Sequence, residues 1–305
     1  MDWIEKKIDA IARDRSHGAT QLASSAIRIL MNICKRSKEK DPSRLASAVR
    51  QTALSLAKVR PSMAPIRNWS LVFCQGLQEI IRQGTSLSEA QQRGVILGEE
   101  LLAQKDRLVD LQVEAGRAIL KNRKSVFTLS YSSTVESILS YALPSSCRVV
   151  IAESRPLMEG RRLFKNLEHI FADLRMITDA QMGLAIPNTD LVLVGADTIL
   201  GDLAVLNKTG TYLSALVSHT HSCDFFVAAD TYKINVAMNS GNCVLESKSG
   251  RELWPQHEEN CDNVYFDITP AKLISGFLTE EGLLDVSGMK THLQKWKDLY
   301  RDLEF

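Results

Sequence analysis

The sequence predicts an α/β protein: an N-terminal helical domain, residues 1–121, followed by an α/β domain with a mostly parallel sheet, residues 122–305. Two observations predict this class. Apolar residues recur at helical spacing through the first part of the chain, where strand patterns are scarce. After Lys121-Asn122-Arg123-Lys124, five short apolar runs follow, separated by segments long enough for crossovers, which is typical of βαβ units and a parallel sheet.

Composition narrows the class of protein. The 305 residues are 45% hydrophobic and 24% charged, with a formal net charge of +1, so there is no electrostatic reason for strong nonspecific nucleic-acid or membrane binding. The N-terminus is too charged for a signal peptide, and no apolar run approaches the length of a membrane span. The six cysteines show no close pairing and the six histidines no metal-ligand spacing. We therefore expect a cytoplasmic protein with reduced thiols and with no metal ion, no cofactor and no membrane association.

Helical periodicity accounts for the first domain. It runs from Trp3 through the stripe that ends at Ile33, and it resumes after Asp41-Pro42-Ser43, where Asp41 or Ser43 is placed to cap the helix. A third apolar segment covers residues 69–82, and the longest helix is expected from about Ser88 to Leu120.

Short apolar runs define the second domain. The expected strands are Ser125–Ser130, Arg148–Ser154, Leu174–Asp179, Leu191–Asp197 and Phe225–Asp230. The run Val264–Pro270 offers a further strand, whereas Leu273–Leu278 and Met289–Leu303 are expected to be helical.

The stretch from Leu191 to Tyr212 is the main functional lead. Its continuous apolar start suits a strand covered on both faces, and the carboxyl ends of parallel strands face the ligand site. Asp197 therefore lies where a catalytic or substrate-binding carboxylate is expected, or else it caps a turn or pairs with a lysine. Residues 207–211 combine a cap, the charge of Lys208 and a glycine before an apolar segment. This pattern suits a phosphate at a helix N-terminus, or an ordinary capped helix with an exposed lysine.

Polar residues follow three other expected strands, those that end at Ser130, Ser154 and Asp230. Residues 130–134 form a hydroxyl-rich turn that could bind phosphate oxygens, or only cap the next helix. Arg155 follows a strand, beside a proline that can start the next helix, and is placed to hold an anion in a bidentate fork. Arg161 and Arg162 are interpreted as a solvated helix face. Lys233 places a second lysine at the same edge as Lys208.

Several motifs together resemble one family. The motifs are GAD, NKxGTY, FxVAAxTYK, ESRPxxxG, SxSSTV and FDxTP, and the N-terminal HGATQLA and VRPSMA segments also look like the family's pattern. The family is that of the translation initiation factor 2B alpha, beta and delta subunits, which also contains the methylthioribose 1-phosphate and ribose 1,5-bisphosphate isomerases. The stretch ITDAQMG looks closest to archaeal members. The resemblance implies an N-terminal helical domain and a C-terminal Rossmann-like domain, usually dimerised through the latter.

The resemblance implies an altered catalytic pair. In the isomerases the GAD aspartate works with a cysteine to move a proton between C1 and C2 of a ring-opened sugar phosphate, and Asp197 matches that aspartate. The cysteine belongs to a Thr-His-Cys stretch, which here is Thr128-Leu129-Ser130. A serine hydroxyl has a far higher pKa than a thiol and is a poor proton shuttle without an activating base.

The phosphate ligands of the family are mostly kept. The isomerases use an Arg-Gly-Ala stretch, which here is His17-Gly18-Ala19, so that a fixed cation becomes one that is mostly neutral at pH 7. At the other ligand positions this sequence keeps the residue that the family's motifs have. The substrate-binding residues implied are His17, Gly18, Ala19, Arg60, Ser132, Ser133, Arg155, Asn207, Lys208 and Lys233.

Two functions follow from this resemblance. The first is a regulatory subunit homologue that binds a sugar phosphate or nucleoside monophosphate at the carboxyl ends of the strands. It would form a homodimer or higher oligomer through the C-terminal domain, or assemble with translation initiation factor subunits. The second is an aldose-ketose isomerase of the ribose 1,5-bisphosphate type, with Asp197 as general acid or base and Ser130 or a water in the cysteine's role. The residues favour the first, because loss of a thiol from a coupled pair usually removes orders of magnitude in rate.

Overall fold

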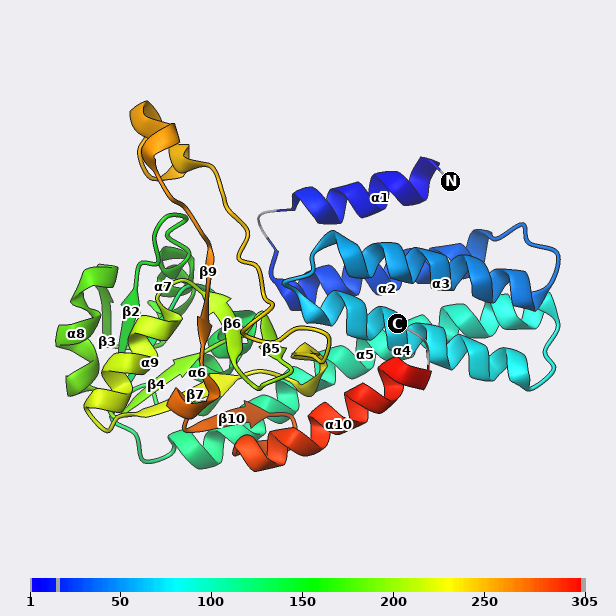
Figure 1. The fold of residues 1–305 in the computed structure, drawn as a ribbon. Coiled ribbons are helices and arrows are strands. Elements are labelled where there is room, and N and C mark those ends of the chain that lie inside the picture. The colour runs from blue at the N-terminus through cyan, green and yellow to red at the C-terminus, as the bar shows by residue number, and fades with distance from the viewer. Residues whose placement is uncertain (1, 15–16, 303–305) are drawn as a thin grey trace. The chain divides into compact units, whose positions relative to one another are not determined.

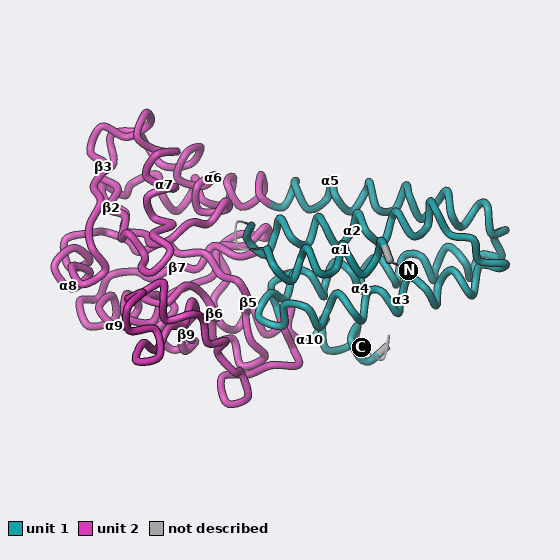
Figure 2. Tube along the Cα trace, turned by 90° about the horizontal axis from the view of Figure 1, so that it is seen from above, with its two compact units in different colours: residues 1–108, 232–234, 294–305 teal, residues 109–231, 235–293 magenta. Residues whose placement is uncertain are grey.

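The computed structural model describes residues 2–14 and 17–302 (Figure 1). The chain divides into two compact units (Figure 2). Unit 1 comprises Met1–Leu108, Tyr232–Ile234 and Gln294–Phe305, and unit 2 comprises Val109–Thr231 and Asn235–Leu293. The chain passes from unit 1 to unit 2 inside one long helix, and the domain limit expected near residue 121 stays a prediction.

Unit 1 is built from helices. They are α1 (Asp2–Arg13), α2 (Ala19–Arg36), α3 (Pro42–Val59), α4 (Ala64–Arg82) and the first part of α5 (Leu87–Leu120). Helix α2 packs on both α3 and α4, around fully buried side chains that include Leu30, Leu45 and Trp69. Of the two expected caps, Asp41 is the one used, because its carboxylate accepts a hydrogen bond of 2.9 Å from the Arg44 backbone N–H. Helix α4 begins before the predicted residue 69, with Pro65 in its first turn.

Unit 2 contains a seven-stranded sheet in the order β11-β10-β7-β4-β1-β2-β3. The strands are β1 (Ser125–Leu129), β2 (Arg148–Ala152), β3 (Asp173–Ile177), β4 (Leu191–Val194), β7 (Asp224–Ala228), β10 (Gly276–Thr279) and β11 (Gly282–Leu284). Neighbours are parallel except β10 and β11. All five strands expected from the first apolar runs are present in this sheet.

The helix expected over Leu273–Leu278 is wrong. Only a short 3-10 turn, η6 (Ala271–Leu273), lies there, and the chain then enters β10 parallel to β7. A short apolar run does not by itself distinguish a buried strand from a helix. Gly276 lets β10 approach its neighbour, because a Cβ there would lie 2.8 Å from a side-chain carbon of Leu283.

A second sheet, in the order β8-β5-β6-β9, was not expected. It contains β5 (Thr198–Leu200), β6 (Val205–Lys208), β8 (Ile234–Asn235) and β9 (Phe266–Thr269). The run from Val264 is a strand as predicted, but it pairs antiparallel with β6. Lys208 therefore ends a strand, and the helix start expected at residue 207 is displaced to Thr211, after Gly210 at a φ of 106°.

Helices cover both faces of the large sheet. Alternate strand residues such as Val126, Val149 and Leu193 join one buried cluster with α5, α6 (Ser133–Ala142) and α7 (Gly160–Leu167). The opposite face carries α9 (Thr211–Thr220), which contacts β4 and β7. Helix α7 begins at Gly160 rather than just after Pro156, and Arg161 and Arg162 are exposed on it as expected. Helix α10 (Val286–Asp302) confirms the last predicted helix.

No helix in the described ranges combines the length and the apolar character needed to cross a bilayer. All six cysteines lie in the described ranges and are free thiols, three of them buried.

Candidate functional site

The strand order places a switch point at β1. Crossovers from β1 lead outward to β2 and β3, whereas β4, β7 and β10 continue on its other side. Open α/β sheets bind ligands outside the carboxyl ends of the strands at such a point. The segments that follow β1 and β4 carry Ser130 and Asp197, so the sequence-based expectation and the topology select the same edge of unit 2.

Ser130 is held in an unusual backbone conformation at the end of β1. Its φ is 61°, and its N–H donates a 2.7 Å hydrogen bond to Oγ of Ser154, which follows β2 with a φ of 62°. Residues other than glycine rarely adopt such backbone angles, and where they do, contacts with the surrounding structure must hold them in place. Ser154 is in turn fixed by Asp179, whose carboxylate accepts 2.8 Å and 2.7 Å hydrogen bonds from the N–H groups of Ser154 and Arg155. The Asp179 carboxylate thus fixes the loop that follows β2. Through Ser154 it also fixes the loop that follows β1.

Arg155 projects from this fixed loop. The residue is exposed, and no hydrogen bond or ion pair joins its guanidinium to another residue in the described parts of the chain. A guanidinium whose backbone is held and whose donors are available suits a bidentate contact with a phosphate or carboxylate.

Asp197 lies between β4 and β5. It is half-buried, and its backbone N–H donates a 3.0 Å hydrogen bond to the carbonyl of Leu206 on β6. The residue before Ala196 is Gly195, where a Cβ would lie 2.8 Å from Oγ of Ser132. This close approach brings the exit of β4 against the start of α6.

Ser132 caps α6. Its hydroxyl accepts a 3.4 Å hydrogen bond from the N–H of Val135, and both it and Ser133, the first helical residue, are half-buried. The capping interpretation of this hydroxyl-rich turn is therefore confirmed for Ser132. A contact of either serine with a phosphate stays a prediction.

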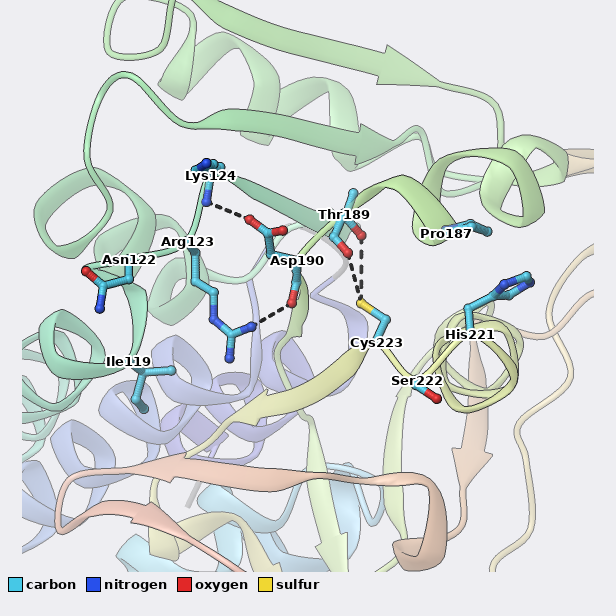
Figure 3. Close-up of a pocket in the computed structure, with 10 residues that line it drawn as sticks. All are labelled: Ile119, Asn122, Arg123, Lys124, Pro187, Thr189, Asp190, His221, Ser222 and Cys223. Carbon is cyan, nitrogen blue, oxygen red and sulfur yellow. Dashed lines mark hydrogen bonds between the residues drawn. The ribbon is translucent and has the colours of Figure 1, made fainter.

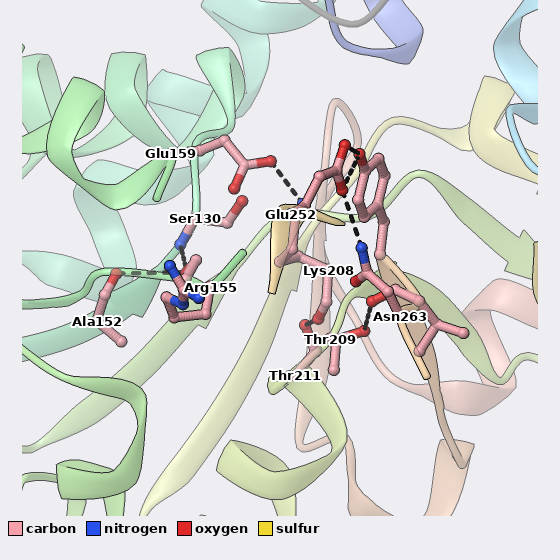
Figure 4. Close-up of polar contacts among 12 residues, drawn as sticks. Ser130, Ala152, Arg155, Glu159, Lys208, Thr209, Thr211, Glu252 and Asn263 are labelled. Carbon is pink, nitrogen blue, oxygen red and sulfur yellow. Dashed lines mark hydrogen bonds and ion pairs between the residues drawn. The ribbon is translucent and has the colours of Figure 1, made fainter. Parts of the chain in front are cut away.

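Lys208 forms a buried ion pair. Its Nζ lies 2.5 Å from Oε1 of Glu159 and 4.9 Å from the ring centroid of Tyr265 (Figure 4). The lysine side chain is 8% exposed and the glutamate 27%. The lysine charge therefore already has an internal counter-ion, which the sequence did not indicate.

The backbone N–H groups at the start of α9 also have a partner within the protein. The carboxylate of Asp267, on β9, accepts hydrogen bonds of 2.7 Å from the N–H of Gly210 and 3.1 Å from that of Tyr212. Burial raises the pKa of Asp267 to about 6, although the hydrogen bonds from this turn lower it. The Asn207 side chain is also used within the protein, since its Nδ2 donates a hydrogen bond of 3.0 Å to Oγ1 of Thr211. A side-chain carboxylate thus takes the place expected for a phosphate at this helix N-terminus.

Four expected ligand residues lie near the start of unit 1. Nδ1 of His17 is 2.7 Å from Oδ2 of Asp14, and Nη1 of Arg60 donates to the Asp14 carbonyl at 2.8 Å. Gly18 precedes α2 as its N-cap and Ala19 is the buried first residue of that helix. His17 and Arg60 are therefore brought together by Asp14.

Lys233 is a buried residue of unit 1. It lies in a 3-10 turn whose backbone is held on both sides, because Asn68 Nδ2 donates at 2.7 Å to the carbonyls of Tyr232 and Ile234. The ring of Tyr232 stacks on Trp69 with centroids 4.0 Å apart. The role of Lys233 as a ligand stays a prediction.

A separate hollow of about 650 Å³ lies at the opposite, amino edge of the large sheet (Figure 3). There Arg123 pairs with Asp224 at 2.5 Å, and Asp190 accepts from the backbone N–H of Lys124 at 2.6 Å. None of the residues predicted for the site lines this hollow. Within the described ranges no group of three or more His, Cys, Asp or Glu side chains is arranged to hold a metal ion.

Comparison with known proteins decides the family. The profile of the initiation factor 2 subunit family matches residues 15–286. The chain belongs to this family. It is 32% identical to a translation initiation factor eIF-2B subunit 2-like protein of Pyrococcus horikoshii, over 89% of this chain and 92% of that protein. It is also 27% identical to the ribose 1,5-bisphosphate isomerase of Archaeoglobus fulgidus, over 92% of this chain and 90% of the isomerase.

Solved structures of the family share the fold. The crystal structure of the translation initiation factor eIF-2B from Pyrococcus horikoshii OT3 matches with a TM-score of 0.77 and 29% identity, covering 94% of this chain and 98% of that one. The predicted fold class is thereby confirmed. The tetrameric eIF2B-beta2-delta2 complex from C. thermophilum matches with a TM-score of 0.74 and 20% identity, so its similarity to this chain concerns the fold alone.

Proposed function

We propose that this chain is a regulatory member of the initiation factor 2 subunit family that binds a sugar phosphate or nucleoside monophosphate at the carboxyl edge of the unit 2 sheet without isomerising it. The observation that carries the proposal is the environment of Ser130. In the described parts of the chain, no carboxylate or imidazole is hydrogen-bonded to its Oγ. A serine without such a base is a weak acid–base partner for Asp197.

Ligand binding is supported by Arg155. Its guanidinium is exposed, and Asp179 holds its backbone in place beside the ends of β1 and β2. A guanidinium on a fixed backbone contributes affinity for phosphate, because little conformational entropy of the arginine is lost when the ligand binds. The same edge carries Asp197, which offers a carboxylate to ligand hydroxyl groups.

Assembly through unit 2 is the second part of the proposal. The exposed apolar side chains Leu184, Tyr212, Leu213 and Leu216 lie on α8 (Met182–Ala185) and α9, which contact each other. Such a cluster on two adjacent helices is typical of a surface that another subunit covers. A homodimer or higher oligomer, or assembly with translation initiation factor subunits, would bury it.

Calorimetric titration tests the ligand site. We expect the wild type to bind at least one of ribose 5-phosphate, fructose 6-phosphate and AMP, and Arg155→Ala to weaken that binding about tenfold or more, because a bidentate charged contact is lost. Arg161→Ala is the matched control. It removes an arginine of α7 that pairs with Glu153 at the surface, so we expect its effect to stay within about threefold. Absence of binding by all three ligands would contradict the proposal.

A second candidate function is an aldose-ketose isomerase. It is favoured by the half-buried position of Asp197 at the exit of β4 and by the similarity to the ribose 1,5-bisphosphate isomerase of Archaeoglobus fulgidus. One carboxylate can move a proton between adjacent carbons of a closely held substrate. Conversion of an aldose phosphate to the ketose, lost in Asp197→Asn, is the result that would select this function instead.

A further inference from the structure

Glu159 changes what the Lys208 end of the site can bind. The pair is close, at 2.5 Å, and the lysine side chain is 8% exposed, so water screens it poorly. A phosphate dianion approaching Lys208 would meet the Glu159 carboxylate at the same place. Like charges brought together in such surroundings repel each other strongly.

The pair lies where three strands of unit 2 end. Glu159 precedes Gly160, where a Cβ would lie 2.1 Å from the carbonyl oxygen of Ala152, the last residue of β2. Lys208 ends β6, and two residues later a Cβ on Gly210 would lie 4.0 Å from the side chain of Leu129, the last residue of β1. The ion pair therefore belongs to the same edge of the sheet as Ser130 and Arg155 (Figure 4).

One oxygen of Glu159 has no hydrogen-bond partner among the described residues. Oε1 faces Lys208, whereas Oε2 is buried and accepts no hydrogen bond from any residue in the described parts of the chain. A buried acceptor without a donor is costly, so a ligand that brings a hydroxyl donor to Oε2 gains a favourable hydrogen bond. A carboxylate oxygen accepts a hydrogen bond from a hydroxyl but repels a phosphate.

We propose that Glu159 is a specificity-determining residue that makes this end of the site bind a hydroxyl group and reject a phosphate. The ligand is then a sugar or nucleoside monophosphate, with its single phosphate at Arg155, rather than a bisphosphate. This inference rests on the proposed function, which places a phosphorylated ligand at this edge. Rejection built into the site is a common source of specificity, because the repelled ligand loses affinity without any change in the contacts of the preferred one.

The test compares two ligands that differ by one phosphate. Ribose 5-phosphate and ribose 1,5-bisphosphate are titrated calorimetrically into the full chain, as wild type, Glu159→Gln and Glu153→Gln. We expect the wild type to prefer the monophosphate about tenfold or more, and Glu159→Gln to raise bisphosphate affinity by a similar factor, because the repelling charge is gone. Glu153→Gln removes a carboxylate from the same segment, paired with Arg161 instead of Lys208, and should change the ratio less than about threefold.

The outcomes separate this inference from the proposed function. A wild type that binds both ligands equally, or prefers the bisphosphate, overturns the inference while leaving the ligand site in place, and this holds even if Glu159→Gln does not fold. A ratio unchanged by Glu159→Gln in folded protein, checked by circular dichroism, also overturns it. Failure of every protein to bind either ligand overturns the inference, and the proposed function is overturned as well only if fructose 6-phosphate and AMP also fail to bind.

Discussion

At the scale of single residues, the carboxylate of Asp267 determines the character of the α9 N-terminus. It accepts hydrogen bonds from Gly210 and Tyr212, the backbone groups that a phosphate would otherwise use. Burial outweighs these hydrogen bonds and raises its pKa from 3.8 to about 6. The residue is therefore partly protonated in mildly acidic solution while still capping the helix.

Asp267 predicts a particular dependence of stability on pH. Because the folded-state pKa lies above the unfolded one, this residue stabilises the fold most below about pH 4, and that contribution is lost as the pH rises through about 6. We expect the difference in unfolding free energy between wild type and Asp267→Asn to be larger at about pH 4.5 than at about pH 7.5, by on the order of 1 kcal/mol. Denaturant unfolding of both proteins at the two pH values measures it. A difference that grows toward neutral pH would show that the ionised form is the one favoured by folding.

The sequence predicted which residues lie at the ends of strands, but it did not predict which side chains pair with one another. Arg155, Ser130 and Asp197 lie at strand exits, as their place after apolar runs indicated. The ion pair of Lys208 with Glu159 was missed, because pairing between residues far apart in the chain depends on the fold. The signal available was that Glu159 stands in the ESRPxxxG stretch and Asp267 in FDxTP.

At the scale of elements, the large strands were predictable and the small ones were not. Continuous apolar runs such as Leu191–Val194 identify strands buried on both faces. β5 and β6 have only three and four residues, joined by a tight turn, and a run of this length carries little periodicity. Missing this hairpin placed Lys208 on a helix start instead of a strand end.

The pair of helices α8 and α9 carries the prediction about assembly. Leu184 is 72% exposed and Leu213 is 49% exposed, and exposed leucines on two helices that contact each other are typical of an interaction surface. We expect the wild type to be a dimer or larger at micromolar concentration, and Leu213→Glu to shift it to monomer, because a charge would be buried in the interface. Sedimentation velocity measures the change.

A matched substitution controls for general effects on solubility. Ile96, on α5 in unit 1, is 45% exposed, and Ile96→Glu adds the same charge outside the α8 and α9 cluster. We expect it to leave the oligomeric state unchanged. A monomeric wild type, or a Leu213→Glu protein that sediments like the wild type, would argue against this surface as the contact.

At the scale of the whole molecule, the order of helical and α/β regions followed from the sequence. What did not follow is that residues 232–234 and the end of α10 belong to the compact helical unit. This depends on contacts distant in sequence, such as the 2.5 Å hydrogen bond from the Tyr300 hydroxyl to Asn68 Oδ1 and the stacking of Tyr232 on Trp69. Neither pattern nor spacing encodes such contacts. The sequence therefore predicts Lys233 at the edge of the second domain that carries Lys208, whereas the residue belongs to unit 1.

The central claim is that the protein holds a phosphorylated sugar without converting it. Phosphorus-31 NMR of ribose 5-phosphate and of ribose 1,5-bisphosphate, each incubated with the protein for hours, tests binding and conversion in the same sample. We predict a saturable shift or broadening of the ribose 5-phosphate signal and no ribulose phosphate from either compound. Formation of a ribulose phosphate by the wild type but not by Asp197→Asn, or no change in any signal, would contradict the account.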